Sequence, residues 1–397
     1  MKENSILLLT KDAMCTAYLP CYGNTYWKGK TPNLDELAAK GTLYTRFYTA
    51  APSSNMSYLA MSTGKFPYEL DIQSYVHLTK DYDGVTLFDR AREQGFVCHI
   101  LWDDAWTPDI AYCRCYGENT VFHPIVGLRQ GVGSHYKHEG FLTPDDEKLR
   151  HSLRMLREEI DIISSTDESV FLWIHLPHVI NGRTGFGSDI DVFDDILGMM
   201  REYFLDDHIF VSADHGNMNG QEGILGYGFD GRESEIRIPL ITPRRNGLAV
   251  CDALMCNTDM YSILFEGTVP EREHIFSDTA YYGQDHRILN IIKGKYKYIF
   301  HKADGKEELF DLTWDPNEQF SLISDIHYDQ ARKESYPARE HYFYDSWDEL
   351  PSVREDFRAI RAAMWRDLTT SEKANRKTKA ICKKALKTLR NAFQKRS

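Results

Sequence analysis

The sequence lacks several features that would by themselves indicate a class of protein. No stretch approaches the roughly 20 consecutive apolar residues that a helix needs to span a bilayer. There are no internal repeats and no low-complexity tracts, which excludes solenoid and collagen-like architectures. Residues 1–4, which precede the first apolar run, do not have the pattern of a signal peptide. We therefore expect a globular chain that is neither membrane-spanning nor exported.

The eight cysteines are scattered along the chain and do not suggest a disulfide framework. Cys113 and Cys115 form a Cys-x-Cys pair, but no second pair follows at zinc-ligand spacing, so we interpret them as ordinary thiols. Scattered, unpaired cysteines are typical of proteins in a reducing compartment. This usage predicts a cytoplasmic location.

The net charge of −12 is unevenly distributed, because residues 371–397 contain ten Lys or Arg and one acid, Glu372. Apolar residues recur at helical spacing between these lysines, as Ile381, Leu386, Leu389 and Phe393. A basic amphipathic helix of this kind is suited to contact an anionic membrane, here the inner face, or to pack on the acidic body of the protein. We do not expect nucleic-acid binding, since no basic patch with aromatic stacking residues accompanies the candidate site.

Metal-binding side chains follow two strand-like runs. Residues 209–213 are apolar and end at Asp214, His215 and a glycine, and residues 5–10 form a second short apolar run that Asp12 follows. In open α/β sheets, ligands bind beyond the carboxyl ends of the strands. We therefore expect Asp12, Asp214 and His215 to meet at one sheet edge.

A serine-rich turn between these runs supplies a candidate nucleophile. Residues 31–41 have the signals of a capped helix, residues 44–49 resemble a strand, and residues 51–64 read as a turn entering a short helix that Gly64 ends. Such a turn presents Ser54 at a helix N-terminus, where free N–H groups favour an alkoxide and an anionic ester.

In this order, the motifs resemble the sulfatase branch of the alkaline phosphatase superfamily, which includes sulfatases and the phosphoglycerol- and phosphoethanolamine-transferase-like enzymes. The resemblance covers most of residues 5–320. It is carried by residues 6–12, 22–23, 31–35, 63–64, 178, 212–216, 236–240, 292–298, 308–312 and 315–316. It implies a three-layer α/β core with a mixed, mostly parallel sheet.

The resemblance implies that Ser54 is the catalytic nucleophile. In sulfatases this position is a cysteine or serine that is oxidised to formylglycine within a Cys/Ser-x-Pro-x-Arg signature. Here Met56 replaces the proline and Tyr58 replaces the arginine, so we expect Ser54 to remain an unmodified serine. An unmodified hydroxyl is typical of the phosphotransferases and phosphodiesterases of the superfamily.

The resemblance also implies a metal site formed by Asp12, Ser54, Asp214 and His215. Many sulfatases have two aspartates after the first strand, whereas Ala13 follows Asp12 here. Three oxygen donors and one nitrogen donor suit a single Mn²⁺, Zn²⁺ or Mg²⁺ better than Ca²⁺, which prefers an all-oxygen cage.

Three further residues have expected roles from the resemblance. His178 matches a substrate-contacting histidine and is the first choice for the catalytic proton donor. His175 is a weaker candidate, for substrate binding. Tyr227 stands where many relatives have a histidine between two glycines and is the other substrate-binding candidate, through a hydrogen bond from its hydroxyl; a structural role for it is the alternative.

We accordingly predict a catalytic α/β domain over residues 1–265, a smaller α+β subdomain over 266–345 and a helical basic tail over 346–397. The predicted function is metal-dependent hydrolysis or transfer of a phosphoester, on a surface-glycan or lipid-linked precursor. Two alternatives are a sulfuric ester hydrolase and a catalytically degenerate protein that binds a partner through the same cleft.

Overall fold

A computed structural model of the chain describes residues 4–26, 28–70, 82, 84–103, 116, 119–125, 146–178, 180, 189–219, 225–228, 230–279, 286–313, 315–323 and 349–364. Two of the features discussed above lie outside these residues, namely the Cys113–Cys115 pair and the basic segment 371–397. No helix within the described ranges is long and apolar enough to cross a membrane.

An eight-stranded sheet forms the centre of the molecule, with strands in the order β11-β2-β10-β7-β1-β6-β4-β5. Most neighbouring strands are parallel, and β10 is antiparallel to both of its neighbours. The strands are β1 (Ile6–Lys11), β2 (Thr42–Tyr44), β4 (Val97–Asp103), β5 (Val121–Ile125), β6 (Val170–Leu176), β7 (Ile209–Ala213), β10 (Leu240–Thr242) and β11 (Val250–Cys251).

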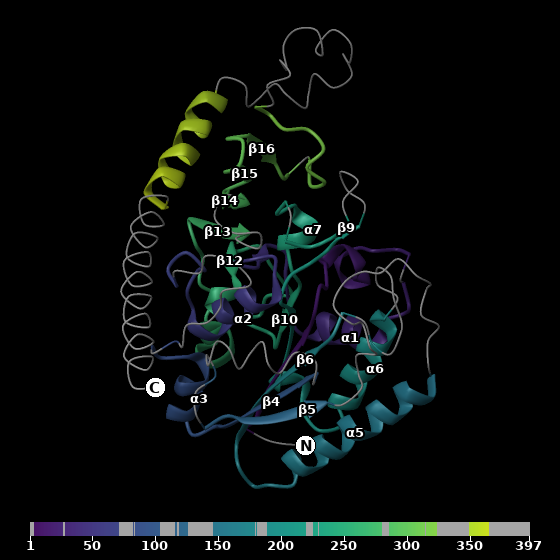
Figure 1. Ribbon diagram of the computed structural model, residues 1–397. Helices are drawn as coiled ribbons and strands as arrows, with labels where there is room; N and C mark the ends of the chain where they lie inside the picture. The colour runs from purple at the N-terminus through teal and green to yellow at the C-terminus, as the bar shows by residue number, and fades with distance from the viewer. Residues whose placement is uncertain are drawn as a thin grey trace, which may run out of the picture.

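Helices cover both faces of this sheet. Figure 1 shows α1, α5 and α6 on one side and α2 and α3 on the other. Their bounds are α1 (Pro32–Lys40), α2 (Ser54–Thr63), α3 (Leu87–Glu93), α5 (Asp146–Ser164) and α6 (Ile190–Met200), and a short α7 (Glu233–Ile236) lies above them. The expected three-layer α/β core with a mixed, mostly parallel sheet is confirmed.

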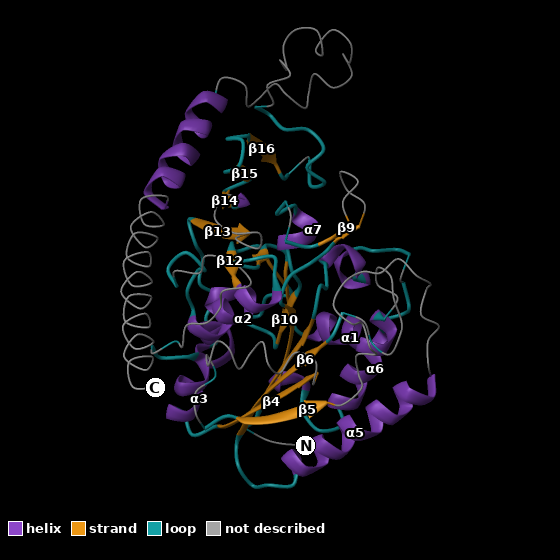
Figure 2. Cartoon of the chain, viewed as in Figure 1, coloured by secondary structure: helices purple, strands orange, loops and turns teal. Residues whose placement is uncertain are grey.

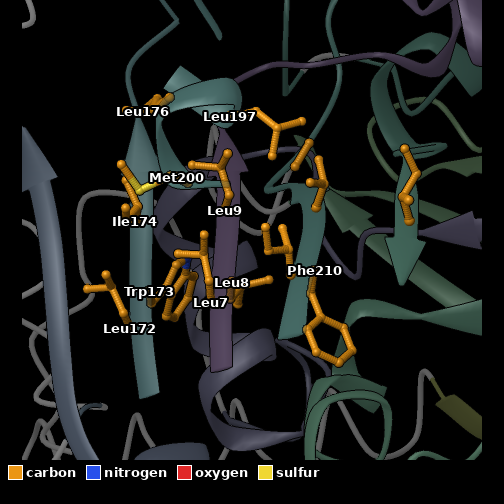
Figure 3. Packing of buried hydrophobic residues seen from close by; sticks show 14 of the residues in the cluster. Leu7, Leu8, Leu9, Leu172, Trp173, Ile174, Leu176, Leu197, Met200 and Phe210 are labelled. Carbon is orange, nitrogen blue, oxygen red and sulfur yellow. The ribbon is translucent and has the colours of Figure 1, made fainter. Parts of the chain in front are cut away.

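The central strands are buried because they consist almost entirely of large apolar residues, as parallel strands covered on both faces require. Figure 3 shows Leu7, Leu8 and Leu9 of β1 between β6 and β7, with α6 packed above them. All three leucines are completely buried. This packing holds β6, β1 and β7 in a rigid array, so that residues following these strands have fixed positions.

A second, four-stranded sheet follows in the chain, and Figure 2 shows it beyond one end of the large sheet. It is antiparallel, in the order β13-β14-β15-β16, with bounds β13 (His274–Thr279), β14 (Ile288–Lys293), β15 (Tyr296–His301) and β16 (Glu307–Asp311). A further helix spans residues 350–364. This sheet and helix lie in the C-terminal part, where a smaller α+β subdomain was expected, whereas the domain boundaries at 265 and 345 stay predictions.

One local expectation is corrected by the structure. Residues 44–49 do not form one strand, because β2 pairs within the large sheet whereas β3 (Phe47–Tyr48) pairs with β12 (Met255–Cys256). In the four-stranded sheet, β14 and β15 are joined by a turn at Gly294, whose φ of 56° lies in the left-handed region that glycine adopts readily. A small hairpin, β8 (Met218–Asn219) with β9 (Leu225–Gly226), completes the sheets described.

Candidate active site

Three neighbouring parallel strands end at the same edge of the large sheet. In the register, Lys11 of β1 lies opposite Leu176 of β6 and Ala213 of β7. Asp12 directly follows β1, and Asp214 and His215 directly follow β7. The expected meeting of these side chains therefore follows from strand register.

Asp12, Asp214 and His215 form a buried cluster whose possible ligand atoms all lie within 4.8 Å of one another. We call these three residues together with Ser54 the edge cluster. His215 Nε2 is 3.5 Å from Asp12 Oδ1, 3.4 Å from Asp214 Oδ2 and 3.1 Å from Ser54 Oγ. The four predicted metal ligands are thus brought together, although they come from three distant segments.

Hydrogen bonds determine how His215 is oriented. Its Nδ1 is 2.8 Å from the carbonyl oxygen of Gly216, so Nδ1 carries the proton and donates it. The lone pair is then on Nε2, which faces the two carboxylates. Metal-binding histidines in proteins are held in the same way by a partner on the other ring nitrogen.

Two further features of the edge cluster fit a divalent cation. Asp12 Oδ1 is buried, and no described residue gives it a hydrogen bond. Within the described chain, neither carboxylate of the cluster forms an ion pair with Lys or Arg. Two buried carboxylates and a histidine lone pair that converge without a cation would repel one another, and a metal ion removes that cost. The donor set therefore suits one divalent ion, whose identity this geometry does not select.

Ser54 is the first residue of α2, as expected for a nucleophile at a helix N-terminus. The first turn of α2 is fixed to β7, since Ser57 Oγ donates to the Asp214 carbonyl oxygen at 2.6 Å. Asn257 Nδ2 in turn donates to Ser57 Oγ at 2.9 Å and to Thr49 Oγ1 at 3.1 Å. These contacts hold Ser54 beside the metal ligands.

Tyr58 is one turn further along α2, and it is a residue to which the sequence assigned no role. Its hydroxyl is 3.0 Å from Asp214 Oδ2, to which it donates, and 2.7 Å from His175 Nε2. Burial and the negative charges of Asp214 and Asp12 raise the pKa of Tyr58 well above its ordinary value, so the phenol keeps its proton. The tyrosine that replaces the signature's arginine thus orients Asp214, a predicted metal ligand.

His175 is buried at the end of β6 and has a partner at each ring nitrogen. Thr10 Oγ1 is 2.8 Å from Nδ1, and Tyr58 is the partner of Nε2. Thr10 also accepts a hydrogen bond from Trp173 Nε1 at 2.9 Å. This arrangement favours a role for His175 in holding Tyr58, and the substrate-binding role stays a prediction.

A pocket lies next to the edge cluster. Its lining includes Lys11, Tyr18, His178, Asp189 and Asn217. His178, the expected proton donor, follows β6 and is partly exposed at this pocket. The sequence missed Lys11 and Asp189, although a lysine that ends an apolar strand directly before Asp12 was a usable signal.

Tyr227 lies beside His215 rather than inside the pocket lining. The two rings are tilted by 37° with centroids 4.3 Å apart. This stacking restricts the imidazole to one plane, whereas the expected contact of Tyr227 with a substrate stays a prediction.

A second group of potential ligands lies at the four-stranded sheet. Asp230, His301 and Glu308, which we call the second cluster, also have ligand atoms within 4.8 Å of one another. Here Arg232 is already bound to both carboxylates, with Nε 2.8 Å from Asp230 and Nη2 3.1 Å from Glu308. The negative charge is therefore balanced by the protein, which makes the edge cluster the better metal site.

Comparison with known proteins finds relatives for part of the sequence and for the whole fold. No protein-family model matches the chain. Over 189 residues the chain is 28% identical to N-acetylgalactosamine-6-sulfatase of Homo sapiens and of Canis lupus familiaris, covering 45% of this chain and 35% of the relative. Human arylsulfatase A is 28% identical over 138 residues, with 34% and 26% covered.

Solved structures show the same fold. A phosphonate monoester hydrolase of Agrobacterium radiobacter superimposes with a TM-score of 0.59 at 15% identity, covering 89% of this chain and 96% of that one. A sulfatase from Pseudoalteromonas sp. superimposes with a TM-score of 0.56 at 16% identity, covering 87% and 92%. The chain belongs to the sulfatase and alkaline phosphatase-like superfamily. Its alignment spans about a third of the length of the curated N-acetylgalactosamine-6-sulfatases.

Proposed function

We propose that this protein is a metal-dependent phosphoester hydrolase or phosphotransferase that uses Ser54 as its nucleophile. The observation that carries the proposal is the position of Ser54 Oγ, 3.1 Å from His215 Nε2 and within the buried edge cluster. The N-terminus of α2 also favours negative charge on Ser54 and on the ester. Phosphonate monoester hydrolases among the structural neighbours support chemistry at phosphorus.

Asp12, Asp214, His215 and Ser54 would hold one Mn²⁺, Zn²⁺ or Mg²⁺. Such an ion, when bound, stabilises an alkoxide and the charge that develops on the ester oxygens. Ser54 Oγ would react as the alkoxide, its proton having passed to solvent; it attacks phosphorus, and the bond from phosphorus to the alcohol oxygen breaks. Tyr58 keeps Asp214 oriented during this step through its hydrogen bond of 3.0 Å.

The leaving alcohol needs a proton, and His178 is our proposed donor because it lines the pocket beside the cluster. The resulting phosphoserine is then attacked by water, which gives hydrolysis, or by an acceptor hydroxyl, which gives transfer. His178, having lost its proton to the alcohol, accepts one from the attacking hydroxyl group. The second half-reaction thus releases Ser54 as the alkoxide that entered the first, and it returns His178 to its protonated form.

A sulfuric ester hydrolase is the second candidate, because the curated relatives are sulfatases. Against it stand Met56 and Tyr58, which leave Ser54 without the formylglycine signature. We favour the phosphoester reaction for this reason. The sugar sulfate in the name of the first relatives supports a glycan-linked substrate, and a lipid-linked one remains part of the proposal.

The test measures the turnover of three aryl esters by the metal-loaded protein. Turnover of bis(4-nitrophenyl) phosphate or 4-nitrophenyl phosphate, with phosphate trapped on Ser54 and detected by peptide mass spectrometry, supports the proposal. Preferential turnover of 4-nitrophenyl sulfate favours the sulfatase. Bound metal with no turnover of any ester favours the remaining alternative, a catalytically degenerate protein that binds a partner.

Location and membrane contact are also proposals. The described cysteines Cys15, Cys21, Cys98, Cys251 and Cys256 are free thiols, in agreement with the proposed cytoplasmic location. Contact with the inner face of the membrane through residues 371–397 predicts salt-sensitive binding to vesicles of anionic lipid. A chain truncated after residue 370 should lose that binding and keep its activity on a soluble ester.

A further inference from the structure

A buried ion pair lies in the wall of the pocket beside the edge cluster. Lys11 Nζ is 3.1 Å from Asp189 Oδ1, and the two side chains are 5% and 2% exposed. Lys11 ends β1 directly before the metal ligand Asp12, and Asp189 directly precedes α6. Buried pairs are often no more stabilising than apolar residues of similar volume, so a pair in the wall of this pocket calls for a functional explanation.

The carboxylate of Asp189 is only half satisfied. Oδ1 contacts Lys11, whereas no described residue donates a hydrogen bond to Oδ2, which is buried. A carboxylate before a helix ordinarily caps it, but the Asp189 side chain makes no capping hydrogen bond to α6. The capping role expected for an aspartate at this position is therefore absent, and among the described residues none donates to this acceptor in the pocket wall.

The charge of the pair indicates which donor fits. Burial raises the pKa of Asp189 to about 6 against the opposing effect of Lys11, so the carboxylate is ionised at neutral pH. Lys11 balances this charge, and the pair has no net charge with which to attract a cation. A neutral hydroxyl group therefore suits Oδ2 better than an ammonium group.

We propose that Asp189 Oδ2 accepts a hydrogen bond from a hydroxyl group of the alcohol part of the substrate, and that Lys11 holds the carboxylate in place. The substrate class is then the ester of a polyhydroxy alcohol, such as a sugar or glycerol. The proposal rests on the proposed function for the position of the ester at Ser54. A site built to hydrogen-bond a hydroxyl rejects analogues without it, because its buried acceptor is left unpaired.

The experiment measures binding rather than turnover, in metal-loaded protein carrying Ser54→Ala. Calorimetry compares 2,3-dihydroxypropyl phosphate with propyl phosphate and 3-aminopropyl phosphate, and repeats the comparison with the three sulfate esters. In whichever series binds more tightly, phosphate or sulfate, we expect the dihydroxypropyl ester to bind at least about 10-fold more tightly than the propyl and aminopropyl esters. This is the size of effect typical of one satisfied polar contact.

Variants then assign the preference to the pair. Lys11→Met combined with Asp189→Leu removes both charges together and should reduce the preference to about twofold or less. Asp189→Asn, which keeps the volume, should reduce it in part, and Lys11→Arg should retain it. Asp191→Asn is the matched control, since Asp191 lies two residues away and its Oδ1 accepts from Val192 N. Inorganic phosphate, which has no alcohol part, should bind all variants equally.

A preference that persists in the double variant would overturn the proposal, as would equal affinity for the three esters or no binding of any. If the double variant does not melt cooperatively, Asp189→Asn alone decides. If only the proposed function fails, the result is different: wild-type protein would bind the dihydroxypropyl ester selectively but would not turn it over.

Discussion

The edge cluster and the second cluster each contain two acids and a histidine whose possible ligand atoms lie within 4.8 Å of one another. The two clusters are nevertheless chemically different. In the second cluster Arg232 bridges the two carboxylates, and Lys306 Nζ adds a contact of 3.2 Å to Glu308. In the edge cluster, as far as the structure describes the chain, no basic side chain neutralises either carboxylate. Ligand geometry alone therefore does not make a metal site, and an unbalanced buried charge distinguishes the two.

The second difference concerns the neighbours of the two clusters. The edge cluster has a hydroxyl nucleophile at a helix N-terminus and a pocket at its side. The second cluster instead joins β15 and β16 of the four-stranded sheet to the loop before α7. We therefore expect the edge cluster to govern chemistry and the second cluster to govern stability.

The largest expected effect is on turnover at Ser54. Ser54→Ala should reduce kcat by about 10⁴-fold or more, as for other covalent nucleophiles, because in the described part of the chain no second serine or threonine hydroxyl contacts His215 Nε2. Metal content and the thermal melt should change little. Ser53→Ala is the control, since Ser53 precedes α2 and makes no capping hydrogen bond. Turnover close to wild type in Ser54→Ala would end the covalent mechanism.

Metal binding provides the next test of the comparison. Asp12→Asn should weaken binding of Mn²⁺ or Zn²⁺ by more than about 100-fold, since the loss of an outer partner alone costs 10–100-fold. Glu308→Gln should leave the bound metal unchanged, because the second cluster is already neutralised. Plasma mass spectrometry of dialysed protein and competition with a chelating dye give the two affinities. Equal loss in both variants would mean that both clusters bind metal.

The loss of stability at acid pH tests the structural role of the second cluster. Burial alone would raise the pKa of Glu308, but the hydrogen bond with His301 and the charges of Arg232 and Lys306 lower it from 4.5 to about 2. A carboxylate with a lowered folded-state pKa stabilises the fold fully above about pH 4.5, and this stability is lost as the pH falls toward 2. Between pH 7 and pH 3 we expect Glu308 to account for about 2 kcal/mol of lost unfolding free energy.

Chemical denaturation across this range measures the effect. In Glu308→Gln the free energy of unfolding should be lower at neutral pH and should fall less steeply on acidification. An identical pH dependence in the two proteins would show that Glu308 is not ionised within the ion-pair network at neutral pH.

The smallest effect is expected at Tyr58. Tyr58→Phe removes the donor to Asp214 and the partner of His175 Nε2, and should weaken metal binding by about 10-fold, or about 1.4 kcal/mol. Tyr48→Phe is the matched control, because Tyr48 is equally buried and its hydroxyl donates to Glu233 Oε2 at 3.2 Å. The control should lower the melting temperature without changing metal affinity. The opposite pattern would contradict the positioning role of Tyr58.

Several features could be read from the chain alone. The apolar runs of β1, β6 and β7 predict buried parallel strands, and the residues directly after them predict a site at their carboxyl ends. Asp12, Asp214 and His215 were named in this way, Ser54 was named from the serine-rich turn and the family resemblance, and the four are adjacent in the structure. The prediction of one strand over residues 44–49 was wrong. This segment is divided between β2 and β3, which pair in two different sheets, and no local sequence pattern encodes that pairing.

The amino-acid order alone determined which residues end strands, which residue begins α2 and where the ionisable groups occur, since these depend on local periodicity and on turn and capping signals. Only the tertiary structure decided which charges are balanced. Arg232 reaches Glu308 across 76 positions, and Lys11 reaches Asp189 across an even longer separation. Electrostatic energy depends on distance in space and on burial, and neither is contained in sequence spacing. For that reason the sequence predicted the metal ligands, whereas the Asp189 acceptor and the role of Tyr58 appeared only in the folded chain.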